Sequence, residues 1–321
     1  MINILFRRLC QAAFVAWSVG TITFIAMRLL PGDIAYRIAA GRYGYDYVDQ
    51  AAKLAVEAEL GLDRPAFQLY WQWLLDLVQG DLGRSLVSDA PVIGEIYHQL
   101  GHTVMLAIAA TLVSLLIALP IGVYCGKRAG SKRDQFGLFF SVLLRAQPVF
   151  VIGLLMIILF AIHLRVLPVA GFGSSEYIVL PAVTLAFGLA AMSNRVIRNA
   201  TQRALTSGYY LFARLKGLSE TQAFEHHAQR NIAIPVVAFV GIQAVGLVEG
   251  IVMIESLFSW PGIGHALAHA IFQRDIPMIQ GTALIMGLLF VAINTLVDLA
   301  GYALDPRQRR GHSTKTEEIS S

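Results

Sequence analysis

The chain has 321 residues, of which 56% are hydrophobic and 14% are charged. Soluble domains carry about 25% charged residues, so this composition excludes a water-soluble globule and indicates a protein solvated mainly by lipid. Lys and Arg number 25 against 21 Asp and Glu, an excess too small to support nucleic-acid binding. The two cysteines, Cys10 and Cys125, do not support a disulfide framework.

Six apolar segments are long enough to cross a bilayer as helices, since a span needs about 20 apolar residues. They are Leu9–Leu30, Thr103–Cys125, Phe136–His163, Ile178–Ile197, Pro235–Phe258 and Gly281–Leu304. No signal-peptide cleavage pattern follows the first segment, so we expect it to remain as a helix. The sequence therefore predicts an all-α polytopic membrane protein with six transmembrane helices.

Positive charge is distributed unevenly between the two ends of these spans. The segments on the side of the termini contain 16 Lys and Arg residues, and those on the opposite side contain seven. By the positive-inside rule, both termini are predicted to be cytoplasmic. The predicted organisation is a cytoplasmic N-terminus with the first span (1–30), an extracytoplasmic helical region (31–102), a five-span core with a cytoplasmic loop at about 200–234 (103–304), and a cytoplasmic tail (305–321).

The extracytoplasmic region is too long to be a plain connection and has helical patterning of its own. Pro65 is suited to the start of a helix and Gly80 to its end. One face of the helix between them would be apolar, with Phe67, Tyr70, Trp71, Leu74, Leu75 and Val78. Pro91 could begin a further helix. We therefore expect a small helical cap on the outer membrane face.

The third predicted span contains a polar cluster of Arg145, Gln147 and Pro148. The proline removes a backbone donor, so we expect a kink whose free carbonyl the neighbouring polar groups could satisfy. Two interpretations have equal weight. Arg145 either lines a pathway through the membrane or forms a structural ion pair with a neighbouring helix.

Irregular backbone is predicted after the fifth span, in the sequence ESLFSWPGIGHALAH. Glu255 lies near the outer end of the span, and Pro261, Gly262 and Gly264 would then force a turn before a helix around 266–272. Such backbone is tolerated at membrane depth only against protein or a water-filled cavity. Together with Asp298 of the last span, these four residues join the Arg145 cluster as candidates for a pathway or gate.

The polar loop from Ser207 to Val237 has apolar stripes of its own, which favours docking of a partner over a plain solvated connection. The first stripe has Tyr210, Leu211, Phe212 and Leu215, and Gly217 then suits the left-handed residue after a helix. Ser219 and Gln222 have capping-box spacing and would restart a helix on which Phe224, Ala228 and Ile232 share a face. Pro235 is expected to mark the next boundary.

This loop resembles the cytoplasmic coupling loop of ABC importer permeases. The resemblance is carried by the string ARLKGL with His227, Asn231 and Pro235, and the long spacing from glycine to proline favours the dipeptide, oligopeptide and nickel branch. Further matching strings are RLLPGD at 28–33, LGLDRP at 60–65, GDLGRS at 80–85, the glutamate with its P-G-I-G turn, Arg274-Asp275, Asn294 with Asp298, and DPRQR at 305–309. The resemblance implies that the loop binds an ATPase through Tyr210, Leu211, Ala213, Arg214, Lys216, Gly217, Leu218, His227, Asn231 and Pro235.

The resemblance also implies a setting and a mechanism. The chain would be a permease subunit in a bacterial inner membrane, paired with a similar but distinct second permease. Two ATPase subunits would act on the coupling loops, and an extracytoplasmic binding protein would deliver di- or oligopeptides for alternating access. A nickel or metal-chelate importer is an alternative within the branch. A secondary transporter is the more distant alternative, and it lacks support because there is no internal repeat and Glu249, Glu255 and Asp298 are scattered.

Several catalytic and ligand-binding patterns are absent from the sequence. It has no G-x-x-x-x-G-K-[ST], so we expect ATP and Mg²⁺ to be used by partner subunits and no cofactor to be bound by this chain. It has no G-x-S-x-G, which disfavours an intramembrane hydrolase. His265 and His269 are four residues apart on an expected helix, but no third ligand is adjacent, so no metal site is predicted.

Overall fold

The computed structural model describes residues 2–29, 33–44, 48–60 and 65–304. Its named elements are all helical within those ranges, which confirms the predicted fold class. The predicted tail at 305–321 lies outside the described residues, and so do parts of the strings at 28–33 and 60–65. Two compact units can be distinguished: unit 1 comprises Met1–Val104 and Ser259–Val291, and unit 2 comprises Met105–Phe258 and Ala292–Ser321.

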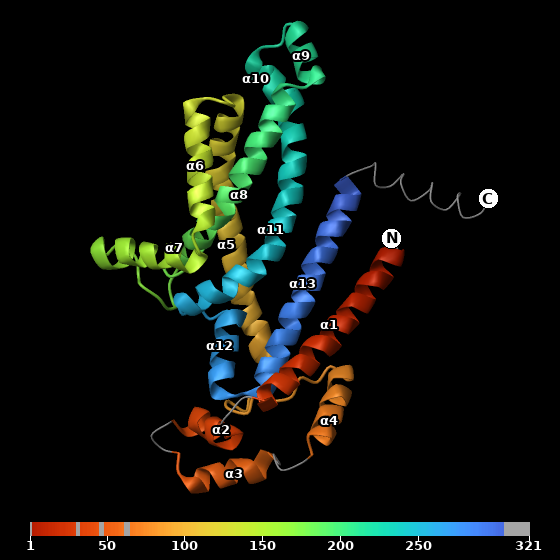
Figure 1. The fold of residues 1–321 in the computed structure, drawn as a ribbon, viewed down its shortest axis with the longest axis vertical. Helices are drawn as coiled ribbons and strands as arrows, with labels where there is room; N and C mark the ends of the chain where they lie inside the picture. The colour runs from red at the N-terminus through yellow and green to blue at the C-terminus, as the bar shows by residue number, and fades with distance from the viewer. Residues whose placement is uncertain (1, 30–32, 45–47, 61–64, 305–321) are drawn as a thin grey trace, which may run out of the picture. The chain divides into compact units, whose positions relative to one another are not determined.

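Within the described ranges, five helices are long and apolar enough to cross a membrane. Figure 1 labels each of them. They are α1 (Ile2–Leu29), α5 (Val92–Lys127), α8 (Val179–Leu205), α11 (Gln229–Leu257) and α13 (Ile276–Leu304). The number becomes six if one bent pair of helices counts as a single span. That pair is α6 (Lys132–Ala146) and α7 (Val149–Met156), with α7 continued by a π-helical segment, η2 (Ile157–His163).

The kink predicted at Pro148 is present as a sharp break, at which α6 and the α7–η2 helix meet at 99°. The cause is local. A residue that precedes a proline is pushed out of the α region by the proline ring. Gln147 accordingly has ψ 136°, and Pro148 then becomes the N-cap residue of α7.

One predicted helix boundary is confirmed and another is wrong. A helix begins directly after Pro91, as α5, and continues without a break into the predicted second span, whereas Pro235 lies inside α11 instead of at a boundary. An interior proline removes one backbone hydrogen bond. The loss of that one bond does not end α11, because Ile232 and Val236 on either side of Pro235 are both buried in the core of unit 2.

Unit 1 contains the short helices of the predicted cap, namely α2 (Ile34–Tyr43), α3 (Gln50–Leu60) and α4 (Ala66–Val78). Helices α2 and α3 bury Ile38 and Val56 in a common cluster. Asp33 caps α2 by accepting a hydrogen bond from the Tyr36 backbone N–H, and it forms an ion pair with Lys53 of α3. The hydrogen bond from Lys53 lowers the pKa of Asp33 below its usual value.

Helix α4 ends as predicted, with Gly80 at φ 78° and the backbone N–H of Asp81 bonded to the carbonyl of Asp76. It packs on α1, where Tyr70 and Thr21 share a hydroxyl hydrogen bond of 2.8 Å and the Trp73 ring covers Gly20. Much of the predicted apolar face remains exposed within unit 1, including Phe67, Trp71, Leu75 and Val78.

A buried carboxylate joins two parts of unit 1 that are 190 residues apart in the chain. The Ser85 hydroxyl donates to Asp275 Oδ2 at 2.5 Å, and the Leu86 backbone N–H donates to Oδ1 at 3.1 Å. Asp275 also accepts from the Met278 backbone N–H, so it caps the start of α13. The GDLGRS and Arg274-Asp275 strings therefore meet at one point.

The P-G-I-G turn is held on the N-terminal part of α5 by two further hydrogen bonds in unit 1. The Trp260 indole donates to the carbonyl of His102 at 3.1 Å, and the Ile263 backbone N–H donates to Thr103 Oγ1 at 2.8 Å. Trp260 is almost fully buried. The turn leads into α12 (Ile263–Gln273), which confirms the helix predicted around 266–272.

Unit 2 is built around α8. Gly122 and Gly126 of α5 allow close approach, since a Cβ on Gly126 would lie 2.6 Å from Thr201 Cβ and 2.7 Å from the carbonyl oxygen of Arg198. This G-x-x-x-G spacing is typical of tightly packed membrane helices. On another side of α8, Arg198 forms a two-pronged ion pair with the buried Asp134 of α6, with N···O distances of 2.6 and 2.9 Å.

Replacing Gly126 with Leu should destabilise unit 2, because the atoms that a new side chain would meet belong to a backbone carbonyl and a β-carbon. Overpacking of this kind costs about 1–3 kcal/mol. We expect a lower apparent Tm for the detergent-solubilised chain in differential scanning fluorimetry. Gly101→Ala is the matched control, since a Cβ at Gly101 meets no atom within 4 Å. Equal Tm values for the two variants would contradict the close packing.

Replacing Asp275 with Ala should leave the buried Ser85 hydroxyl and two backbone N–H groups without their acceptor. Each group that is buried without a partner costs about 1–3 kcal/mol. The exposed Asp89, which pairs with Arg84, supplies the control variant Asp89→Ala, whose cost should stay below about 1 kcal/mol. The measurement is again apparent Tm, and a smaller loss for Asp275→Ala than for Asp89→Ala would contradict the structural role of this carboxylate.

Candidate functional site

The predicted coupling loop forms a compact tip on unit 2, between the ends of α8 and α11 (Figure 1). It consists of α9 (Gly208–Leu215), α10 (Glu220–Ala223) and a π-helical segment, η3 (Phe224–Ala228). We call these residues, 208–228, the tip segment. A π-helical turn contains an extra residue and is found frequently at functional sites.

One side of the tip segment is anchored in the core of unit 2. Tyr210 and Ala213 of α9 are buried in one cluster with Ala200 and Ala204 of α8. The same cluster includes Ala223, Ala228, Ile232 and Val236 from the tip and the start of α11, with Leu218 and Phe224 packed against it. The second predicted stripe, Phe224, Ala228 and Ile232, does share one face, but that face packs into the core of unit 2 and is not available to a partner. The tip segment is therefore supported directly by the ends of α8 and α11.

The other side of α9 presents apolar side chains to the surroundings. Leu211 and Phe212 are more than half exposed, and Leu215 is 85% exposed. The Lys216 ammonium lies 4.6 Å from the centre of the Phe212 ring, so the edge of this apolar face is basic. An apolar face held on a buried anchor is suited to insertion into a pocket of another protein.

The end of α9 has the predicted geometry. Gly217 adopts φ 90°, the Leu218 N–H donates to the carbonyl of Ala213, and the Gly217 N–H donates to that of Arg214. These two bonds form a Schellman motif. Ser219 and Gln222 then form a complete capping box, and Arg214 donates to the Leu218 carbonyl at 2.7 Å.

The remaining residues of the predicted coupling set lie beyond α10. His227 and Asn231 are exposed, and the Asn231 side chain donates to the His227 carbonyl at 2.7 Å. Pro235 follows on the exposed surface of α11. The structure thus places the coupling set on one continuous stretch at the tip, and its role in coupling remains a prediction.

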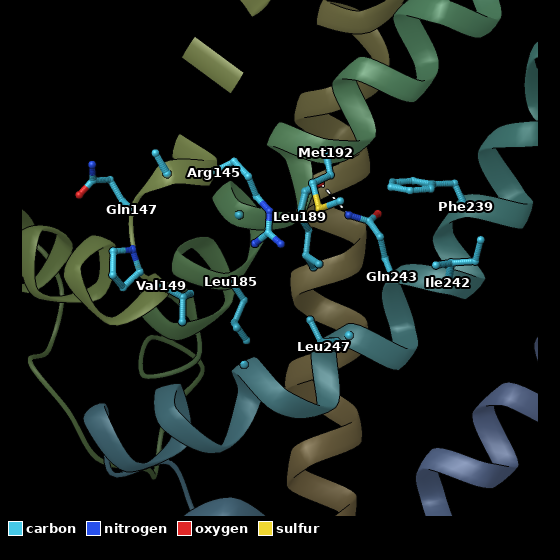
Figure 2. Close-up of a pocket in the computed structure, with 15 residues that line it drawn as sticks. Arg145, Gln147, Val149, Leu185, Leu189, Met192, Phe239, Ile242, Gln243 and Leu247 are labelled. Carbon is cyan, nitrogen blue, oxygen red and sulfur yellow. Dashed lines mark hydrogen bonds between the residues drawn. The ribbon is translucent and has the colours of Figure 1, made fainter. Parts of the chain in front are cut away.

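A separate cleft of about 710 Å³ opens in unit 2 at the break between α6 and α7. Arg145, Gln147 and Pro148 all line it, together with residues of α8 and α11. Figure 2 shows the Arg145 side chain reaching into the cleft toward Leu189 and Gln243, whereas the Gln147 amide points away from it.

Gln243 is a residue of the cleft that the sequence analysis missed. Its Oε1 accepts a hydrogen bond from Ser193 at 2.7 Å, and its Nε2 donates to the Leu189 carbonyl at 2.9 Å. The sequence does contain a signal for this residue, because Gln243 is an isolated amide side chain within the apolar run of the fifth predicted span. Such a group must find a partner on a neighbouring helix.

The other pathway candidates are not gathered around this cleft. Glu255 is fully buried in unit 2 and does not line it, and Asp298 is exposed on α13 and does not line it either. Pro261, Gly262 and Gly264 belong to unit 1, where Trp260 and Ile263 hold their turn on α5. Within unit 2, Glu255 and Asp298 therefore do not share the cleft with Arg145.

Two histidine pairs occur in unit 1. The rings of His265 and His269 are 4.5 Å apart, and those of His98 and His102, a pair that the sequence analysis did not note, are 4.8 Å apart. Burial, followed by the nearby His269 imidazole, lowers the pKa of His265. The described residues contain no group of three His, Cys, Asp or Glu side chains that could hold a metal ion.

Comparisons with known proteins agree on one family. Residues 118–310 match the family described as binding-protein-dependent transport system inner membrane component, and residues 1–129 match the N-terminal family of such membrane components. Glutathione transport system permease proteins GsiC from Escherichia coli O6:H1 and Salmonella typhi are each 33% identical over 309 residues, covering 96% of this chain and 99% of theirs.

A solved structure described as an amino acid ABC transporter with histidines has a similar fold. The TM-score is 0.51 at 14% identity, and the match covers 64% of this chain and 92% of that one. At this identity the likeness concerns the fold alone.

Replacing Gly217 with Val should loosen the tip segment without affecting packing. A Cβ at this position meets no atom within 4 Å, so the cost arises from φ 90° alone and amounts to about 1–2 kcal/mol. We expect faster hydrogen exchange of the Leu218 amide, whereas Gly217→Asn should have a smaller effect because Asn tolerates the left-handed region. Unchanged exchange in Gly217→Val would show that the glycine conformation is not needed there.

Proposed function

This chain belongs to the binding-protein-dependent inner membrane components of ABC importers, and on that premise we propose that it is one of two distinct permease subunits forming a path for peptides. As a permease of such an importer it works with ATPase subunits and an extracytoplasmic substrate-binding protein. It is a multi-pass protein of the inner membrane. The peptide assignment is supported by relatives named for transport of glutathione, a tripeptide.

The observation that carries the proposal is the two-sided α9 of the tip segment. Tyr210 and Ala213 fix it to α8, and Leu211, Phe212 and Leu215 face outward. In our proposal this outward face inserts into a cleft of an ATPase subunit. Closure of the ATPase dimer would then displace α9, and its buried anchor would carry the displacement into α8 and α11 for alternating access.

We assign no catalytic step and no cofactor to this chain. ATP and Mg²⁺ would be used by the partner ATPases. Both termini and the tip segment would be cytoplasmic, as the distribution of Lys and Arg favours. The second permease would be a similar but distinct subunit, so the transmembrane assembly would be a heterodimer.

The test uses the full complex reconstituted in vesicles with its binding protein, and the variant Leu215→Asp. A charge in an apolar contact at the centre of an interface removes about 2 kcal/mol or more of binding, so ATPase copurification and coupled uptake of a labelled tripeptide should both fall at least tenfold. The matched control is Val78→Asp on α4, where the side chain is 84% exposed. This variant should lower neither ATPase copurification nor uptake. Parental uptake and copurification in Leu215→Asp would refute the coupling role.

The same vesicles test the substrate and the orientation. Uptake of a nickel chelate in place of the tripeptide would favour the alternative within the family. A single cysteine at Lys132, with Cys10 and Cys125 replaced by Ser, should react with an impermeant thiol reagent only from the side on which the ATPases bind. Reaction from the opposite side alone would overturn the proposed orientation.

A further inference from the structure

We propose that the cleft at the break between α6 and α7 is a binding site for a carboxylate of the transported solute, and that Arg145 is the residue that holds it. This inference rests on the proposed peptide transport and deepens it by naming the group that this chain recognises.

The depth of Arg145 is the first step. Helix α6 begins at Lys132, close to three other bases at the ends of α5 and α6, and Arg145 is thirteen residues further along. At a rise of 1.5 Å per residue the two lie about 20 Å apart along the helix, against a hydrocarbon core of about 30 Å. A cation at this depth is costly unless it is paired or faces a water-filled cavity, and such residues mark substrate pathways.

The guanidinium of Arg145 has no carboxylate among its described neighbours. Arg145 makes no ion pair with any carboxylate among the described residues, and none of the described side chains that line the cleft is acidic. The cleft is also lined by the Gln243 side-chain amide. Its oxygen accepts a hydrogen bond from Ser193, and one of its N–H groups donates to the Leu189 carbonyl. Among the described side chains that line the cleft, Arg145 therefore supplies the charged hydrogen-bond donors, and none of these side chains supplies a carboxylate to neutralise them.

The size and lining of the cleft suit a small solute. The volume of about 710 Å³ lies within the range of small-molecule sites, about 300–1,000 Å³. A Cβ on Gly188 or Gly246 would meet no atom within 4 Å, so both glycines border open space. Phe239, Ile242, Leu185 and Met192 make the remaining wall apolar (Figure 2). The cleft thus offers one exposed cationic side chain beside open apolar walls, which suits a small solute with a charged end and variable side chains.

The ligand chemistry follows from the guanidinium. Its planar fork matches the two oxygens of a carboxylate in a bidentate arrangement. Every linear peptide ends in such a group whatever its sequence. Recognition of that end alone would let one cleft accept peptides that differ in their side chains.

The first test measures uptake of labelled trialanine and of its C-terminal amide by the reconstituted complex, in the parent and in Arg145→Gln. The binding protein is the same throughout, so its own preference cancels in the ratio between variants. We expect Arg145→Gln to reduce uptake of the acid at least tenfold and that of the amide less than threefold, with partial recovery of the acid in Arg145→Lys. Arg165→Gln, which removes an exposed cation outside the cleft, is the matched control.

Three outcomes separate this inference from the function on which it rests. Equal effects of Arg145→Gln on the two probes would overturn the carboxylate site and leave peptide transport standing. Failure of Arg145→Gln to assemble with the second permease would also overturn it, because Arg145 would then pair with a carboxylate of that subunit. Transport of neither probe by the parent would overturn the proposed peptide transport.

A second test needs no turnover. In a chain without Cys10 and Cys125, Gly246→Cys places a thiol in the open cleft, and its rate of alkylation can be followed in the assembled complex without the binding protein. Trialanine should slow this reaction at least threefold more than its amide does, and the difference should vanish when Arg145→Gln is added. Gly101→Cys controls for general effects of the peptides. Equal protection by acid and amide would refute the site.

Discussion

The close contact between α5 and α8 is the constraint on which unit 2 depends. At Gly122 and Gly126 the two helices approach so closely that a single β-carbon would collide with the backbone or β-carbons of α8. In lipid there is little hydrophobic gain from bringing helices together, so van der Waals contact and interhelical polar bonds must supply the stability. The ion pair of Asp134 with Arg198 and the hydrogen bond from Asn194 to Ser141 add that polar component between α6 and α8.

This central helix also connects the two functional regions of unit 2. Leu185 and Leu189 of α8 line the cleft, and Ala200 and Ala204, further along the same helix, lie beneath α9. Helix α11 repeats the arrangement, with Ile232 under the tip and Gln243 in the cleft. Helices α8 and α11 therefore connect the surface that would contact an ATPase with the cleft that would contact a solute. A displacement at one end need not pass through flexible loops to reach the other.

Sequence reasoning succeeded where the cause is local and failed where it lies in distant packing. The glycine after α9 and the capping box that follows are properties of a few neighbouring residues, and both are present. A proline had opposite results at two sites: at Pro148 the residue before it leaves the helical region, whereas α11 continues through Pro235. The contact of Ser85 with Asp275 joins two strings that the sequence analysis named separately, and no local pattern predicts that they meet.

The π-helical segment at Phe224–Ala228 sets the phase of everything that follows it. An α-helix turns by about 100° per residue, so if the same residues formed a regular α-helix without the extra residue of the π-turn, α11 would be rotated by about that angle relative to α9. Ile232 would leave the cluster beneath the tip, and the side chains at Phe239 and Gln243 would turn away from the cleft. This short π-helical turn therefore fixes the rotation of α11 relative to the tip segment, and a change that converted it to a regular α-helix should disturb the cleft although the turn lies in a surface loop.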